Sequence, residues 1–494
     1  MTPHLRALPG DPASPPLGTS HLPEEGVGVD LAPLGYTEHE YLVDGTAGLH
    51  RHRDGVRERV GELPFTTRVL VRVPAPGRFN GVVAAEPLHP DYDSAPAWRV
   101  AHGWITATGA AWVGITQDHR SAATLREHYD PDRYREVSLP AAGLGWDIVG
   151  SVLADLRTPG RSVLGEPAAR VRHVYLSGWS NTGSFCRVFL QDGFHERHRL
   201  PDGRPAVDGY LIGISSGAAG ASGYPPLSED SEVLPPDDPR RTIGPAGVPV
   251  IELLSEFESE THHAALRPDS DAPEDRYRLY QVAGTSHHDP LTSTVLTNTA
   301  QFRRKGHDVS DWRIAEPTSD ARPDAVARAV YALLHRWAAT GQAPPRAARF
   351  TFAAAESEAP AGTAEELLRD EDGNVTGGVR TPWVEAPLAS YRPHSTPAPG
   401  SCLPSPWAPL ADPRAVAGLI GHMTPLPPTR LAGLYPGPGD RTHRFEEACA
   451  RLTGQGLLLE EDARALLDAA RRTRLPTPPD HHAAATTDEK GPRT

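Results

Sequence analysis

Lysine and cysteine are both scarce in this chain of 494 residues. The only lysines are Lys305 and Lys490, so nearly all of the positive charge is arginine. The formal net charge of −14 argues against nucleic acid and anionic membrane surfaces as partners. The three cysteines, Cys186, Cys402 and Cys449, show no CxxC spacing and form no framework of pairs. The fold is therefore expected to be stable without disulfides.

Long hydrophobic runs are also missing. No apolar segment is long enough to cross a bilayer, and Met1–Pro23 lacks the apolar core of a signal peptide. A cytoplasmic protein is the expectation. The two ends of the chain, residues 1–25 and 475–494, are rich in proline and polar residues and are predicted to be disordered tails.

Between these ends, short apolar segments alternate with helical periodicity. Two early segments, 35–47 and 63–74, have the alternation of antiparallel strands. Buried strands and amphipathic helices then follow one another, as in a mostly parallel sheet with helices on both faces. The strands are predicted at 79–85, 110–116, 171–176, 208–215, 248–254 and 278–282, and the helices at 97–109, 144–157 and 324–339.

The predicted organisation is one large α/β domain over residues 26–395, followed by an extension over 396–474. The extension begins Pro-rich, as if wrapped over the surface, and ends in two helices within 445–472. Residues 216–247 are rich in Gly, Pro and Asp and lie between two predicted strands, so they are a possible lid over a pocket.

The stretch 171–190 has the outline of a strand, a tight turn and a helix. The turn contains Gly178, Ser180, Thr182 and Gly183, which approximate the G-x-S-x-G nucleophile elbow, with the second glycine one position late. Such a turn exposes the serine hydroxyl above the sheet and directs the N-terminus of the helix toward a developing oxyanion. Ser180 is therefore the candidate nucleophile.

A serine hydroxyl needs a base, and the base needs an acid that fixes its tautomer. In this fold class the order along the chain is Ser, acid, His. His287 follows one predicted strand end and is the candidate base, while Glu256 and Glu258 follow another and are the two candidate acids. The sequence leaves the choice between the two glutamates open. Metal-ligand spacing is missing in two histidine-containing segments, His287-His288-Asp289 and the His262–His263 pair.

The expected oxyanion hole combines the N–H of Asn181 with one from the loop after the 79–85 strand. That loop offers the N–H groups of Leu88 and His89, because Pro87 and Pro90 have none. Trp179, directly before Ser180, completes the predicted set of oxyanion and substrate-binding residues.

Four segments together resemble a bacterial α/β-hydrolase domain family. The elbow is similar to its G-x-S-Q-S-G-R-F signature, and residues 282–287 read V-A-G-T-S-H as in the family. Residues 79–88 resemble F-N-G-T-V-V-V-E-W-L, and 377–383 match a G-G-x-R-x-P-W block. The resemblance covers roughly residues 33–475 and implies an α/β-hydrolase fold with hydrolase chemistry. The acidic segment 255–258 is similar to the family's S-E-x-D/E.

The leading functional hypothesis is a cofactor-free serine hydrolase for a small carboxylic ester or lactone, acting through an acyl-enzyme on Ser180. An acyltransferase with the same triad is the alternative within this chemistry. The third possibility is a ligand-binding protein on a hydrolase scaffold that has lost turnover.

Overall fold

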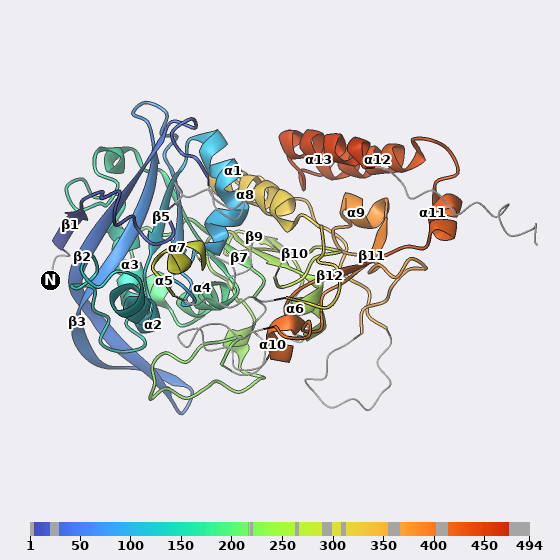
Figure 1. Cartoon of the computed structure of the whole chain (residues 1–494). Coiled ribbons are helices and arrows are strands. Elements are labelled where there is room, and N and C mark those ends of the chain that lie inside the picture. The colour runs from blue at the N-terminus through green and yellow to red at the C-terminus, as the bar shows by residue number, and fades with distance from the viewer. Residues whose placement is uncertain are drawn as a thin grey trace, which may run out of the picture.

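A ten-stranded sheet runs through the structure, which is a computed structural model (Figure 1). The strands are β1 (His4–Leu8), β2 (Tyr36–Arg53), β3 (Val56–Pro74), β4 (Val82–Pro87), β5 (Ala111–Ile115), β6 (His173–Trp179), β7 (Gly209–Gly213), β8 (Val250–Leu254), β9 (Ser270–Ala272) and β10 (Asp275–Gln281). The residues described are 4–19, 29–215, 217, 221–261, 266–288, 299–307, 313–353, 366–401 and 413–473.

The spatial order of the strands is β1-β2-β3-β5-β4-β6-β7-β8-β10-β9. Six neighbouring strands, from β5 to β10, run parallel, while β1, β2, β3 and β9 join antiparallel. This confirms the predicted mostly parallel sheet with extra N-terminal strands. The carboxyl ends of the parallel strands therefore meet at one edge, where sites form in such sheets.

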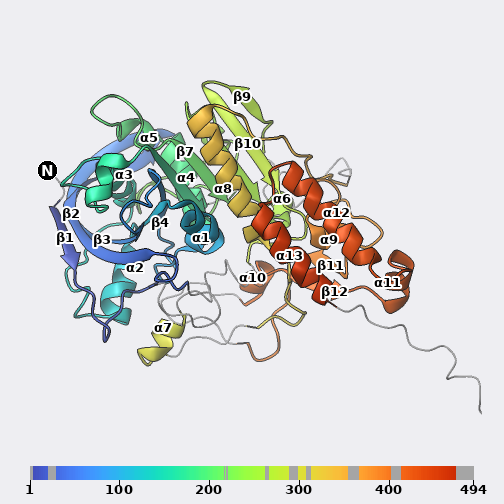
Figure 2. The same ribbon diagram turned by 90° about the horizontal axis from the view of Figure 1, so that it is seen from above.

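Helices cover both faces of this sheet (Figure 2). Helices α1 (Pro96–Thr108) and α8 (Pro323–Thr340) lie side by side on one face, and α3 (Gly145–Asp155) and α4 (Asn181–Gln191) lie on the other. Strand β4 shows why both faces are apolar. Val82 and Ala84 pack toward α1 and α8, whereas Val83 and Ala85 pack toward α3 and α4, because successive side chains of a strand alternate. None of the helices in the described ranges is long and apolar enough to cross a membrane.

The predicted disorder of residues 1–25 is wrong for residues 4–19. Strand β1 pairs antiparallel with β2, and Leu17 is fully buried. The Leu17 carbonyl accepts a hydrogen bond from the buried guanidinium of Arg68 at 2.5 Å. The proline-rich composition concealed a five-residue strand that covers an edge of the sheet. The other predicted tail, 475–494, lies outside the described residues.

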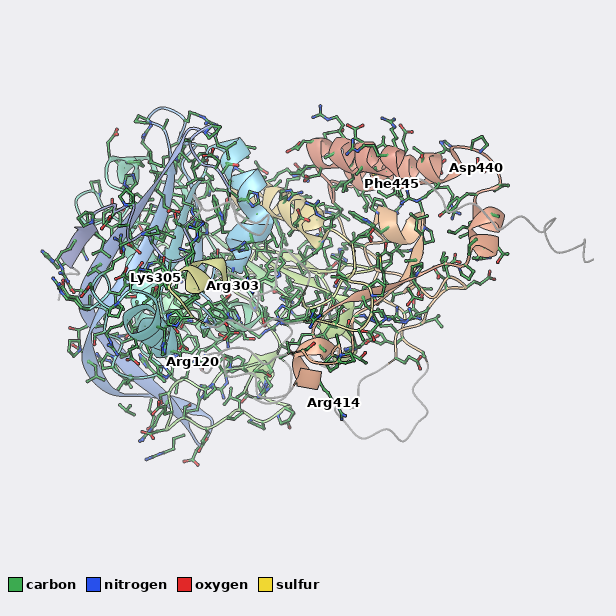
Figure 3. The ribbon with its side chains drawn as sticks, in the orientation of Figure 1. Arg120, Arg303, Lys305, Arg414, Asp440 and Phe445 are labelled. Atoms are coloured by element: carbon green, nitrogen blue, oxygen red, sulfur yellow. The ribbon has the colours of Figure 1, made fainter. Side chains whose placement is uncertain are left out.

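The C-terminal extension packs onto the large α/β domain. Its strand β12 (His422–Pro425) pairs with β11 (Ala389–Arg392), across the predicted boundary at residue 395. Helix α12 (Asp440–Gly454) packs on α9 (Pro382–Glu385), where the rings of Phe445 and Trp383 meet edge to face at 6.1 Å. Figure 3 labels Phe445 on α12. Helix α13 (Glu460–Arg472) is tied to α8 by the Arg328–Asp462 ion pair at 2.6 Å.

Most of the possible lid, residues 221–247, is also described. Its Leu227 carbonyl accepts the indole N–H of Trp146 on α3 at 3.0 Å. Its Tyr224 hydroxyl donates to Asp192, directly after α4, at 2.8 Å. The segment therefore packs against α3 and α4, and a lid over the site stays a prediction.

Candidate active site

Ser180 lies in the turn between β6 and α4, with φ 58° and ψ −124°. A non-glycine residue rarely adopts such a positive φ, and the surroundings must hold it there. Two glycines make the turn possible. A Cβ on Gly178 would lie 1.9 Å from the carbonyl oxygen of Thr182, and one on Gly183 would lie 2.7 Å from that of Gly213. No side chain fits at either position, which explains the small residues around Ser180.

Thr182, the departure from the usual glycine, has a role of its own in this turn. Its hydroxyl donates to the Trp179 carbonyl and accepts the Trp179 N–H, both at 2.9 Å. The side chain therefore closes the elbow across Ser180. The sequence pattern gave no sign of this contact, because a threonine in a turn is common.

Ser180, His287 and Glu258 form a continuous hydrogen-bonded chain. The Ser180 hydroxyl lies 2.7 Å from Nε2 of His287, and Nδ1 of the same ring lies 2.5 Å from Oε1 of Glu258. The His287 side chain is 12% exposed and that of Glu258 is 1% exposed. The three groups come from the carboxyl ends of β6, β10 and β8 respectively. The arrangement can move a proton from the hydroxyl to a ring whose other nitrogen is held by a carboxylate.

Glu258 is fixed by the start of helix α6 (Glu256–Thr261). Its second oxygen, Oε2, accepts the Ser255 N–H at 3.0 Å and the Ser255 hydroxyl at 2.5 Å. The Ser255 hydroxyl oxygen in turn accepts the N–H of Phe257 at 3.1 Å. This is a capping box, S-x-x-E, in which the glutamate reaches back to the cap residue. The pattern is visible in the sequence and would have favoured Glu258 over Glu256.

Glu256 points to a different partner. Its carboxylate accepts the N–H of Gly284 at 2.7 Å and pairs with Arg369 at 2.9 Å. Gly284 begins the loop that carries His287. Glu256 thus holds the loop of the candidate base, and of the two glutamates only Glu258 contacts His287. Burial raises the pKa of Glu256, and Arg369 opposes that shift.

Residues far along the chain support the His287 loop from the other side. The Ser286 hydroxyl donates to the Pro393 carbonyl at 2.6 Å, and the His288 N–H donates to the Leu419 carbonyl at 2.7 Å. Thr381 donates to the Ala283 carbonyl at 3.2 Å. Segments after residue 366 therefore help to place His287, a role that its sequence neighbours alone do not reveal.

The predicted oxyanion donors are only partly as expected. Asn181 is the first residue of α4, where an α-helix offers no carbonyl to its N–H. The N–H groups of Leu88 and His89 are already used, because they donate to the carbonyls of Ile115 and Ser94, both at 2.8 Å. The prediction that these two backbone groups would face an oxyanion is therefore wrong. Loop geometry of this kind is not encoded in a local sequence pattern.

Trp179 is a core residue rather than part of an open pocket. It is 2% exposed and packs against Gly213 of β7. It lines, with Ile214 and Ser286, a cavity of only about 10 Å³. The ring of Trp179 therefore lies in the core, and its assignment to the oxyanion and substrate-binding residues stays a prediction.

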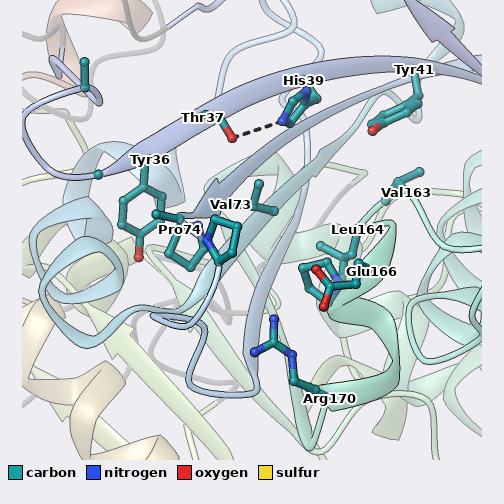
Figure 4. Close-up of a pocket in the computed structure, with 15 residues that line it drawn as sticks. Tyr36, Thr37, His39, Tyr41, Val73, Pro74, Val163, Leu164, Glu166 and Arg170 are labelled. Atoms are coloured by element: carbon teal, nitrogen blue, oxygen red, sulfur yellow. Dashed lines mark hydrogen bonds between the residues drawn. The ribbon is translucent and has the colours of Figure 1, made fainter.

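A groove of about 530 Å³ lies elsewhere on the molecule (Figure 4). It is formed by the start of β2, the end of β3 and residues 163–170, and includes His39, Glu166 and Arg170. Residues 163–170 lead into the amino end of β6, so the groove is at the opposite edge of the sheet from Ser180. Among the described residues, no group of His, Cys, Asp and Glu is arranged to hold a metal ion. His262, His263 and Asp289 lie outside them.

Comparisons with known proteins find matches among solved structures and among protein families. Solved structures that resemble the chain include a mutant of the esterase rPPE, with 15% identity over 57% of this chain and 83% of that one, at a TM-score of 0.32. Another is a thermostable esterase from Pseudomonas putida, with 14% identity over 56% and 83% of the two chains and a TM-score of 0.31. A hyperthermophilic esterase from the archaeon Pyrobaculum calidifontis shows 12% identity over 48% and 75%, with a TM-score of 0.26.

Two comparisons used the sequence of the chain. A search of curated proteins finds no match. The family profile described as alpha/beta hydrolase domain matches residues 7–468, nearly the whole chain. The chain therefore belongs to this alpha/beta hydrolase domain family.

Proposed function

We propose that this protein is a serine hydrolase that cleaves a small carboxylic ester or lactone through an acyl-enzyme on Ser180. The observation that carries the proposal is the hydrogen-bonded chain from Ser180 through His287 to Glu258, with distances of 2.7 and 2.5 Å. In this chain the hydroxyl, imidazole and carboxylate have the roles of nucleophile, base and orienting acid.

In the first half-reaction, Ser180 Oγ attacks the carbonyl carbon while Nε2 of His287 takes its proton. Glu258 accepts the Nδ1–H of His287 and stabilises the imidazolium that forms. The carbonyl π electrons move to oxygen, which the N–H of Asn181 at the start of α4 can stabilise. The intermediate collapses when the leaving alkoxide receives the proton from His287, which leaves an ester on Ser180.

In the second half-reaction, His287 removes a proton from water as the water attacks the acyl carbon. The bond from that carbon to Ser180 Oγ then breaks, His287 returns the proton to Oγ, and the carboxylic acid leaves. An alcohol or amine in place of water would give acyl transfer by the same steps. The two outcomes share every residue described above, so they differ only in the acceptor. A mixed assay, in which a primary alcohol competes with water, measures that preference directly.

The test is hydrolysis of p-nitrophenyl acetate, butyrate and decanoate and of a simple lactone by the wild-type chain and by Ser180→Ala. We expect turnover of at least one ester, and a loss of several orders of magnitude in kcat for the variant. Ser177→Ala is the matched control, because Ser177 lies on the same strand with its hydroxyl 3.4 Å from the Ala85 carbonyl. A wild-type chain that binds esters without turning them over would instead support the non-catalytic alternative.

A further inference from the structure

The loop from His89 to Ser94 follows strand β4 beside the elbow. The pairing of β4 with β6 matches Val82 to His173 and Ala85 to Leu176, a constant offset of 91 residues. Because these neighbouring strands are parallel, the loop after β4 and the elbow after β6 begin at the same edge of the sheet. The loop therefore leaves the sheet at the edge where the candidate nucleophile lies.

This loop is rigidly held. Asp93 accepts hydrogen bonds from the Arg68 guanidinium at 2.9 Å and the Thr116 hydroxyl at 2.8 Å. Arg68 is fully buried and also pairs with Glu40 at 2.5 Å. A bridge between His89 and Ser94 closes the loop. A side chain at its start is thus held in one place before any substrate binds.

Three of the four polar groups of His89 have hydrogen-bond partners. Its N–H donates to the Ser94 carbonyl at 2.8 Å, and its carbonyl accepts from the Ser121 hydroxyl at 3.4 Å. Its Nδ1 accepts the N–H of Asp91 at 3.1 Å, while the Asp91 carboxylate is 3.7 Å away, beyond hydrogen-bond distance. With Nδ1 as an acceptor, the proton of the neutral ring must be on Nε2.

That Nε2–H is the fourth group, and it has no partner within the described part of the chain. The His89 side chain is only 6% exposed, so bulk water does not compensate. A buried donor without an acceptor is unfavourable and calls for an explanation. Burial lowers the pKa of His89 below its usual value, although the Asp91 carboxylate opposes the shift, so the neutral ring is favoured at pH 7.

The unused donor belongs to the same cluster as the candidate base. Burial lowers the pKa of His288, and His287 and His89 lower it further. His287 also contributes to the lowered pKa of His89. The rings of His287 and His288 meet edge to face at 4.7 Å. A neutral imidazole is able to polarise a carbonyl by hydrogen bonding.

We propose that the Nε2–H of His89 is the second oxyanion donor, acting with the N–H of Asn181 on the substrate carbonyl oxygen; this rests on the function proposed above. It takes the place expected for a backbone N–H of Leu88 or His89, both of which are used elsewhere. When the bond between Ser180 Oγ and the carbonyl carbon forms, the carbonyl π electrons move to oxygen and the hydrogen bond from His89 shortens. The proton stays on His89, since His287 handles the proton of Ser180.

The test compares His89→Ala and His89→Gln with the wild-type chain on p-nitrophenyl acetate. Loss of one oxyanion donor is expected to lower kcat by about 10²–10³-fold, with KM within about threefold. Glutamine supplies a new N–H at similar reach, so kcat of His89→Gln should be at least about tenfold higher than kcat of His89→Ala. His173→Gln is the matched control, because His173 lies at the far end of the strand that leads to Ser180.

Inhibitor binding separates catalysis from a structural effect. An alkyl trifluoromethyl ketone forms an oxyanion on the serine, whereas the matching methyl ketone does not. In His89→Ala, the inhibition constant of the first should rise by the same factor as kcat/KM falls, and that of the second should stay constant. A change confined to folding would weaken both ketones together and lower the melting temperature.

Several results would overturn the inference. One is full activity in His89→Ala while Ser180→Ala is inactive, which leaves the proposed function standing. Another is a fall in kcat/KM, matched by weaker binding of the trifluoromethyl ketone, in His288→Gln and not in the His89 variants. His288 is the relevant comparison because its Nδ1 is also buried and unpartnered among the described residues. A wild-type chain that neither hydrolyses esters nor reacts at Ser180 refutes the proposed function, and this inference with it.

Discussion

The exchange Glu258→Gln separates the two candidate acids, because the structure determines how the new amide must sit. Oε2 of Glu258 accepts both the N–H and the hydroxyl of Ser255. In the variant, the amide oxygen must occupy that position, since an NH₂ group has no lone pair for two donors. The NH₂ group then faces Nδ1 of His287, where the carboxylate oxygen lay at 2.5 Å.

Facing a donor, Nδ1 becomes an acceptor and the ring proton moves to Nε2. That nitrogen, 2.7 Å from Ser180 Oγ, then has no lone pair to accept the hydroxyl proton. A tautomer error of this kind lowers kcat by about 10⁴-fold, equivalent to about 5 kcal/mol in the barrier. KM should change little, because Glu258 is 1% exposed and lies behind His287.

The assay is the steady-state hydrolysis of p-nitrophenyl acetate, with the melting temperature measured alongside. Glu256→Gln is the matched control, two residues away and equally buried. Its amide oxygen can still accept the Gly284 N–H, while pairing with Arg369 is weakened, so it should lose up to about 3 kcal/mol of stability and less than about tenfold in kcat. If Glu256→Gln is the inactive variant, or Glu258→Gln keeps more than a tenth of wild-type kcat, the reasoning fails.

Three further predictions follow from the contacts. Thr182→Val leaves the N–H and carbonyl of Trp179 without their side-chain partner, so the free energy of unfolding, measured by urea denaturation, should fall by about 2–4 kcal/mol. Thr182→Ser keeps a hydroxyl and should retain most of that stability. Equal losses in the two variants would show that the hydroxyl of Thr182 does not stabilise the turn. Ser255→Ala removes a donor to Glu258 and should lower kcat about tenfold with unchanged KM; an unaltered kcat would show that the capping box does not position the acid. Burial raises the pKa of Glu86 from 4.5 to about 7. Between these pH values the folded chain binds more protons than the unfolded chain. The free energy of unfolding should therefore fall by about 3 kcal/mol as the pH rises through that window. Glu86→Gln should flatten this part of the pH dependence, and an unchanged slope would rule Glu86 out as its source.

The sequence was a good guide wherever the local structure depends on spacing along the chain. The strand, turn and helix around Ser180 are visible because Gly178 and Gly183 are required by contacts of 1.9 and 2.7 Å. The parallel sheet is visible because its strands are short apolar runs with apolar side chains on both faces. His287 stood out because it follows a strand and a Gly-containing turn.

Contacts between distant parts of the chain were hidden. Strand β1 is too short and too rich in surrounding proline to be recognised without β2 beside it. The support that Pro393 and Leu419 give to the His287 loop depends on backbone carbonyls more than 100 residues away, which carry no residue signature. The N–H groups of Leu88 and His89 have partners closer along the chain, in β5 and in the same loop, but these contacts also form only when the loop and β5 are assembled.

The central claim, that Ser180 is an activated nucleophile, is tested most directly by covalent labelling. The folded chain is treated with a fluorophosphonate, and the modified residue is located by mass spectrometry of the intact and digested protein. The account predicts one phosphonyl group per chain, on Ser180, with labelling abolished in Ser180→Ala and strongly slowed in Glu258→Gln. A chain that stays unlabelled, or one labelled at another residue with equal efficiency in Ser180→Ala, would contradict it.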